Sequence, residues 1–155
     1  MDHAMTPTEC QCQNKQQQHL VSTFDLYCDV PRDHIYSYHA GGLGVIGGVG
    51  YTPDFLRKQI QDLKADLVDK DAPFGVDLLL PQVGKGARAT NYDYTEGKLP
   101  ELIQIIIESG AKLFVSAVGV PPKYAVDKLH AAGIPVMNMI GAPKHVAKAL
   151  AAGVD

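Results

Sequence analysis

One acidic residue, Asp77, lies inside an otherwise apolar segment, and its surroundings make it the first candidate for chemistry. The segment runs from Phe74 to Pro81 and is typical of a parallel strand covered on both faces. Strand side chains alternate, so Asp77 faces away from the helices if Val76 and Leu78 face them. An unpaired carboxylate is costly to bury. Asp77 is therefore either a buried carboxylate satisfied by its neighbours or a ligand-binding group.

Other residue types that commonly do chemistry are less well placed. His130 and His145 fall in predicted helices, away from the strand ends where barrel chemistry sits, and we interpret both as surface residues. Cys10 and Cys12 with His19 are a candidate metal site, but no second pair of ligands completes the set, so we predict no bound metal.

A glycine-rich run, Gly42–Gly47, satisfies the G-x-G-x-x-G pattern of dinucleotide-binding folds. That motif must follow a strand and open a helix, whereas here the strand residues Val45 and Ile46 lie inside the match and the next helix begins only near Pro53. We therefore interpret the glycines as positions of close backbone approach.

The elements that must position these side chains alternate regularly after Ala40. We predict strands at 45–46, 74–81, 113–118 and 136–140, and helices at 53–69, 99–109, 121–133 and 143–153. This alternation indicates an α/β fold of parallel βα units, either an open doubly wound sheet or part of a barrel. In both architectures ligands bind at the carboxyl ends of the strands. We expect residues 1–39 to be a poorly ordered extension and residues 40–155 to be the folded part.

Composition excludes several classes of partner. The chain has 155 residues, 46% of them hydrophobic, and a formal net charge of −3 with its basic residues scattered, so we predict no nucleic-acid or membrane partner. No apolar run approaches a membrane-spanning length and no secretory signal is present, so the expected location is cytoplasmic. A complete (β/α)₈ barrel needs roughly 250 residues, so the chain is too short for one.

About three quarters of the chain resembles the nitronate monooxygenase family, also called 2-nitropropane dioxygenases, and is closest to its fungal members. The resemblance is carried, in order and with matching spacing, by residues 40–48, 74–81, 112–122, 131–137 and 151–155. It implies an FMN-binding TIM (β/α)₈ barrel that oxidises alkyl nitronates with O₂. The chain would then be a partial barrel.

The resemblance also suggests which residues have functional roles. Asp77 stands where bacterial relatives have an asparagine near the flavin ring, Met139 stands near a flavin-contacting position, and Asp155 matches the aspartate of a Gly-x-Asp step, so all three are candidate cofactor-binding residues. The family's catalytic histidine follows that step, beyond Asp155, so we assign no catalytic residue and expect a truncated, weakly active or inactive chain.

Two other interpretations remain open. The chain is also compatible with a catalytically dead βα fragment that acts by pairing its open sheet edges with another chain, including a second copy of itself. The third interpretation is a small α/β nucleotide-binding protein.

Overall fold

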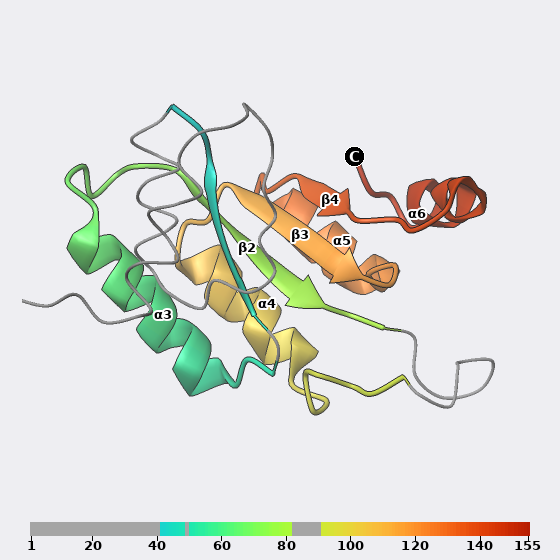
Figure 1. Ribbon diagram of the computed structural model, residues 1–155, viewed down its shortest axis with the longest axis horizontal. Helices are drawn as coiled ribbons and strands as arrows, with labels where there is room; N and C mark the ends of the chain where they lie inside the picture. Colours follow the sequence, from blue (N-terminus) through green and yellow to red (C-terminus); the bar gives the residue numbers. More distant parts are fainter. Residues whose placement is uncertain (1–40, 49, 82–90) are drawn as a thin grey trace, which may run out of the picture.

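The computed structural model describes residues 41–48, 50–81 and 91–155, and the predictions for residues 1–39 lie outside these ranges. Four parallel strands form one sheet in the order β1-β2-β3-β4 (Figure 1). Their bounds are Gly44–Gly48, Phe74–Leu79, Leu113–Val118 and Val136–Asn138. The predicted parallel strands are thus confirmed.

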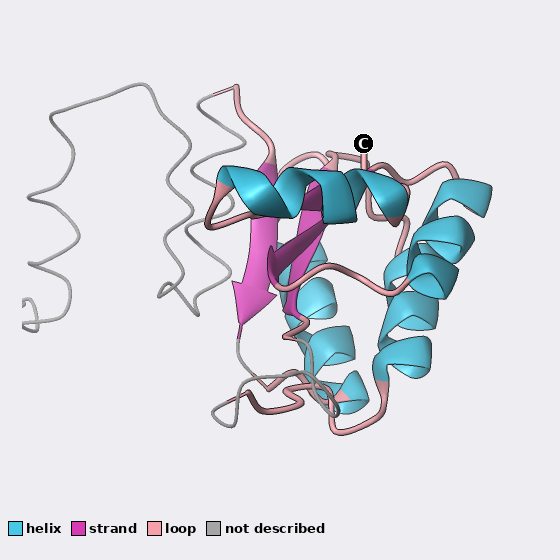
Figure 2. Ribbon diagram, turned by 90° about the vertical axis from the view of Figure 1, so that its right-hand side faces the viewer, coloured by secondary structure: helices cyan, strands magenta, loops and turns pink. Residues whose placement is uncertain are grey.

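Helices alternate with these strands. They are α3 (Pro53–Asp66), α4 (Leu99–Glu108), α5 (Lys123–Ala131), the 3₁₀ turn η1 (Pro143–His145) and α6 (Val146–Ala151). In Figure 1 α3, α4 and α5 lie behind the sheet. In Figure 2 most of the helices stand to one side of the strands, and one helix crosses in front of them. Sequential strand order with helices on one face is the arrangement of a barrel segment, because a doubly wound sheet reverses its order and covers both faces. The fold is therefore a partial α/β barrel.

The core lies between the sheet and helices α3 to α5. Alternate strand residues enter it, including Ile46 of β1, Val76 of β2 and Phe114 of β3, each no more than 2% exposed. Leu56 of α3 and Leu102 of α4 cover them and are fully buried. Burying such a side chain contributes about 1.5–3 kcal/mol, so this packing holds the helices against the strands.

Helix α3 begins as its sequence predicts but ends three residues early. The Thr52 hydroxyl accepts a hydrogen bond from the Phe55 N–H at 3.3 Å, and Pro53 occupies the first helical turn. At the other end Leu67 is extended, and the Lys70 ammonium donates to the carbonyls of Ala65 and Leu67. Because this lysine satisfies terminal carbonyls, the chain can leave the helix before Asp69.

The last predicted elements are shorter than expected. Strand β4 stops at Asn138 rather than Ile140, although the Met139 N–H still donates to the Ser116 carbonyl at 2.9 Å. The final helix is divided into η1 and α6, because Pro143 opens a 3₁₀ turn before the α-helical hydrogen bonds begin.

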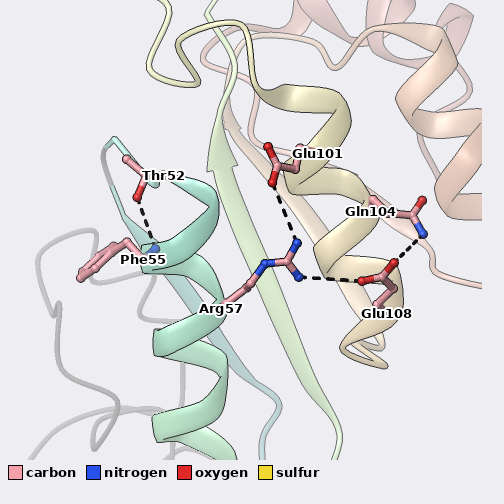
Figure 3. A network of polar contacts seen from close by, with 6 residues as sticks. All are labelled: Thr52, Phe55, Arg57, Glu101, Gln104 and Glu108. Carbon is pink, nitrogen blue, oxygen red and sulfur yellow. Dashed lines mark hydrogen bonds and ion pairs between the residues drawn. The ribbon is translucent and has the colours of Figure 1, made fainter.

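On the surface, Arg57 of α3 bridges to α4. Its guanidinium lies 3.9 Å from a Glu101 carboxylate oxygen and 3.8 Å from one of Glu108 (Figure 3). All three side chains are about half exposed, so solvent screens the pairs and each contributes less than about 1 kcal/mol. The apolar contacts, not these ion pairs, hold the two helices together.

The inner face is the side of the sheet turned away from α3, α4 and α5. Pairing places Val45 opposite Gly75 and Gly47 opposite Asp77, so each pair combines one glycine with one larger side chain. A Cβ on Gly47 would lie 2.8 Å from the Asp77 carboxyl carbon, and one on Gly75 would lie 3.0 Å from a Val45 methyl carbon. The glycines therefore leave the space that their partners' side chains fill.

We predict that Gly47→Ala destabilises the chain by about 1–3 kcal/mol, because the new methyl group must displace Asp77. The measurement is urea unfolding of the variant and the parent at one pH. Gly141→Ala is the matched control, since a Cβ at Gly141 meets nothing within 4 Å.

Repeating Gly47→Ala in an Asp77→Ala background completes a double-mutant cycle. The cost of the methyl group should fall markedly there because the colliding carboxyl group is gone. An unchanged cost would show that Asp77 is not what Gly47 accommodates.

Candidate functional site

Asp77 lies on the inner face, in the second half of strand β2. Its side chain packs over Gly47, and its register partner on the other side is Val115 of β3. Asp77 is only 6% exposed, and its Oδ1 atom is buried with no hydrogen-bond partner among the residues that the structure describes. A buried polar atom without a partner is rare in folded proteins and indicates a strained, catalytic or ligand-binding position.

Burial also changes the acidity of Asp77. Loss of solvent raises the pKa of its carboxyl group from 3.8 to about 6, because an ionised carboxylate is poorly solvated there. Near neutral pH the group can therefore exchange a proton with a bound molecule or accept a hydrogen bond from it.

A second polar cluster fixes the loop after strand β3. The Ser116 hydroxyl donates to the Gly119 carbonyl at 3.0 Å, and the Asn138 side-chain amide donates to the same carbonyl and to that of Ser116. Gly119 has a φ of +78°, and a Cβ there would collide with the Leu80 carbonyl, so only glycine fits. This clamp sets the position of the backbone at the carboxyl ends of β2, β3 and β4.

Sequence reasoning missed Ser116 and Asn138. The signal in the sequence was a single serine inside the apolar segment Leu113–Val118, since a serine buried in such a strand requires a hydrogen-bond partner. The partner could not be named from the sequence, since Asn138 belongs to another strand.

Met139 directly follows β4 and is half-buried. By strand alternation it shares a face with Met137, whose register partner is Val115 beside Asp77. Met139 therefore lies at the end of the sheet where barrels bind ligands. Its contact with a flavin stays a prediction.

Asp155 lies at the opposite end of the sheet, where β4 begins. Its carboxylate Oδ2 accepts a hydrogen bond from the Val136 N–H at 2.9 Å and lies 2.8 Å from His130 Nε2. The Val136 N–H, followed by the His130 side chain, holds the pKa of Asp155 below its usual value. The amino ends of barrel strands serve stability rather than ligand binding, so we do not carry Asp155 into the proposed site.

The remaining candidates give no catalytic group on the inner face. His130 is exposed on α5, and His145 is exposed at the end of η1, not within a strand. Across residues 41–48, 50–81 and 91–155 no three acidic, histidine or cysteine side chains gather as metal ligands, and Cys10, Cys12 and His19 lie outside these ranges. Within the same ranges no helix has the length and apolar character needed to cross a membrane.

The position of the glycine-rich run, Gly42–Gly47, in the structure argues against a dinucleotide site. Residues Gly44–Gly48 form strand β1 itself, and the next helix begins at Pro53. A pyrophosphate loop would instead join the end of a strand directly to a helix N-terminus.

Comparison with known proteins agrees with this geometry. A profile of the nitronate monooxygenase family matches residues 37–155, most of the chain and all of its described strands. The chain belongs to the nitronate monooxygenase family. The resemblance inferred from short segments is thus confirmed.

Two curated relatives are from Mycobacterium tuberculosis. Rv1533, whose name describes it as a monooxygenase, is 24% identical in an alignment that covers 76% of this chain and 42% of the relative. The (3aS,4S,5R,7aS)-5-hydroxy-7a-methyl-1-oxo-octahydro-1H-indene-4-carboxyl-CoA dehydrogenase is 31% identical over 117 residues, covering 76% of this chain and 28% of the relative. The chain therefore spans less than half the length of these relatives.

Two solved structures share the fold. A FabK variant from Thermotoga maritima has a TM-score of 0.63 and 26% identity, covering 83% of this chain and 37% of that one. Nitroalkane oxidase from Streptomyces ansochromogenes has a TM-score of 0.66 and 20% identity, covering 82% of this chain and 41% of that one. Both comparisons support a partial barrel.

We predict that Asp77→Asn changes the pH dependence of stability. In the parent, the pKa of the carboxyl group is 3.8 in the unfolded chain and about 6 in the folded chain. The folded chain therefore has its full stability below pH 3.8 and loses part of it as the pH rises through 6. The loss amounts to about 3 kcal/mol. Urea unfolding at about pH 4, 5.5 and 7 should show the stability of the variant gaining on that of the parent by up to this amount.

Asp127→Asn on α5 is the matched control because Asp127 is an exposed carboxylate paired with Lys123. The stability difference between this control and the parent should vary little over the same range. A constant difference between Asp77→Asn and the parent would contradict the burial of an ionisable group at this position.

Proposed function

We propose that the chain forms the first half of the flavin site of a nitronate-oxidising barrel, with FMN lying against the carboxyl ends of β1 to β4. The observation that carries this proposal is the buried, unpartnered Oδ1 of Asp77. It lies on the inner face, where the carboxyl group fills the space over Gly47.

The described residues suit the ring of a flavin better than its phosphate. Asp77 offers one polar group on an apolar surface made by Leu79, Val115 and Met137, which matches a flat, largely apolar ring with polar edges. In such barrels the phosphate site is frequently formed by loops after the seventh and eighth strands, whereas this chain contributes four described strands.

When bound, FMN would supply the redox chemistry by which an alkyl nitronate is oxidised with O₂. The chain's own residues would position the flavin. Asp77 would hydrogen-bond the ring, Met139 would contact it at the strand ends, and the Ser116–Asn138 clamp would fix the neighbouring backbone. Neither of the two described histidines, His130 and His145, lies beside Asp77, so we propose that residues 41–48, 50–81 and 91–155 supply no catalytic base and that turnover is absent.

We predict that FMN and riboflavin bind the chain weakly and with affinities within a few-fold of each other, because the ring is held and the phosphate is not. Flavin fluorescence titration measures both affinities. At about pH 5, where Asp77 is mostly neutral, Asp77→Ala should weaken binding about tenfold, the value of one lost hydrogen bond, and Asp127→Ala should leave it unchanged.

Oxygen uptake with propyl nitronate and added FMN should be absent. Binding that is unaffected by Asp77→Ala would contradict the proposed flavin position. Nitronate-dependent oxygen uptake would show that a catalytic base is present elsewhere in the chain.

A second candidate substrate is a CoA thioester. It is favoured by the 31% identity to the carboxyl-CoA dehydrogenase of Mycobacterium tuberculosis. A binding measurement distinguishes the two substrate classes: the flavin-loaded chain is titrated with an acyl-CoA and with propyl nitronate, and the change in flavin absorbance shows which of them binds.

We further propose that the chain self-associates through the open edge of β4. Four exposed or half-buried apolar side chains lie in a groove between this edge and α6, namely Met137, Ile140, Val146 and Leu150. Asp155 already pairs with β4 there, since its N–H donates to the Val136 carbonyl at 3.0 Å. We propose that a parallel partner strand pairs with the part of the edge beyond Val136, whose N–H and carbonyl are already bonded to Asp155.

We predict that Leu150→Glu lowers the apparent molar mass of the chain in light scattering, because a charge in the groove opposes apolar contact between copies. Val68→Glu is the control, since Val68 is 82% exposed and lies outside the groove. Equal masses for both variants and the parent would place any association elsewhere.

A further inference from the structure

Asp77 has an acceptor atom that nothing in the described part of the chain satisfies. Its Oδ1 is buried without a partner, and its carboxyl group packs against the backbone of Gly47. An ionised carboxylate needs several donors or a counter-charge to be stable in such a place. The neutral acid needs less, because it has only one O–H group to place and carries no net charge.

No described residue on the inner face supplies a counter-charge. The side chains that the register places around Asp77 on this face are uncharged: Val45, Gly47, Gly75, Leu113, Val115 and Met137. Burial alone raises the pKa of Asp77, with no contribution from a neighbouring charge. Within the described part of the chain, only residual solvent therefore stabilises the ionised form of Asp77.

A ligand on the inner face removes that solvent. A flat molecule lying over Asp77 further disfavours the ionised form unless it brings hydrogen-bond donors of its own. If the ligand presents an acceptor atom, the neutral carboxyl group can donate a hydrogen bond to that atom. This hydrogen bond offsets the cost of removing solvent from Asp77. The lack of a counter-charge and the removal of solvent by the ligand thus both favour the neutral form of Asp77.

We propose that Asp77 acts as a hydrogen-bond donor, in its neutral form, to an acceptor atom of the ligand on the inner face. The site would then select a ligand that presents an uncharged or anionic acceptor at this position and would discriminate against one that presents a donor. This inference rests on the proposed flavin site and adds the polarity of its contact with Asp77.

The experiment measures flavin affinity as a function of pH. With a pKa of about 6, the neutral fraction of Asp77 falls from about one half at pH 6 to about one hundredth at pH 8, so the dissociation constant should rise about 50-fold. Riboflavin is the primary probe, because the phosphate of FMN loses its second proton near pH 6 and would add a dependence of its own.

Asp77→Asn retains an N–H donor that does not titrate in this range. Its riboflavin affinity should be nearly constant from pH 6 to pH 8 and should exceed that of the parent at pH 8 by tens-fold. Asp127→Asn should follow the parent. The pH profile of the parent tests the inference even if the Asp77 variant does not fold.

The outcomes separate the two proposals. If the parent binds riboflavin with an affinity that is constant or increases with pH, or if Asp77→Asn retains the dependence, the donor role is wrong while the flavin site stands. If neither the parent nor any variant binds riboflavin or FMN at any pH, both the flavin site and the donor role are wrong.

Discussion

Burial of β2 along its whole length is the constraint on which the rest of the structure depends. All six residues from Phe74 to Leu79 are buried, and the strand is paired on both edges. β1 and β3 provide the edges, and helices α3 and α4 cover Phe74, Val76 and Leu78. A strand in that position can be almost entirely apolar, and its one polar side chain becomes conspicuous.

That polar side chain connects the fold to the proposed chemistry. Asp77 costs stability as it becomes ionised, because the sheet that buries it offers no counter-charge on the described inner face. Such a cost is usual at functional sites, where a group is held in readiness for a ligand instead of being satisfied by the protein. Gly47 belongs to the same arrangement, since any larger residue there would displace the carboxyl group.

The two ends of the sheet have different roles. At the amino end, Asp155 satisfies the Val136 N–H and contacts His130, which joins the chain after α6 to strand β4 and helix α5. At the carboxyl end, Asp77 is left without a partner at one oxygen, and the Ser116–Asn138 clamp holds the loop at Gly119. In a barrel, the amino ends of the strands serve stability and the carboxyl ends bind ligands, so the unpartnered oxygen is expected at the carboxyl end.

The sequence by itself determined the alternation of strands and helices, the family, and the isolation of Asp77 in an apolar strand. These features are local: Thr52 and Pro53 begin α3, Gly133 follows the end of α5, and apolar periodicity marks the faces between them. Boundaries were less well predicted where a side-chain contact decided them, as with Lys70, which bonds the last carbonyls of α3.

Only the tertiary structure decided which residues meet. Gly47 faces Asp77, Asn138 reaches Gly119, and Asp155 contacts His130 because strand register and the return of the chain bring them together. The alternation of side chains along a strand predicts the face on which a residue lies, but not its neighbour on the next strand. That neighbour is set by how the two strands slide to pack their side chains against a common helical layer, which no single segment of the sequence specifies.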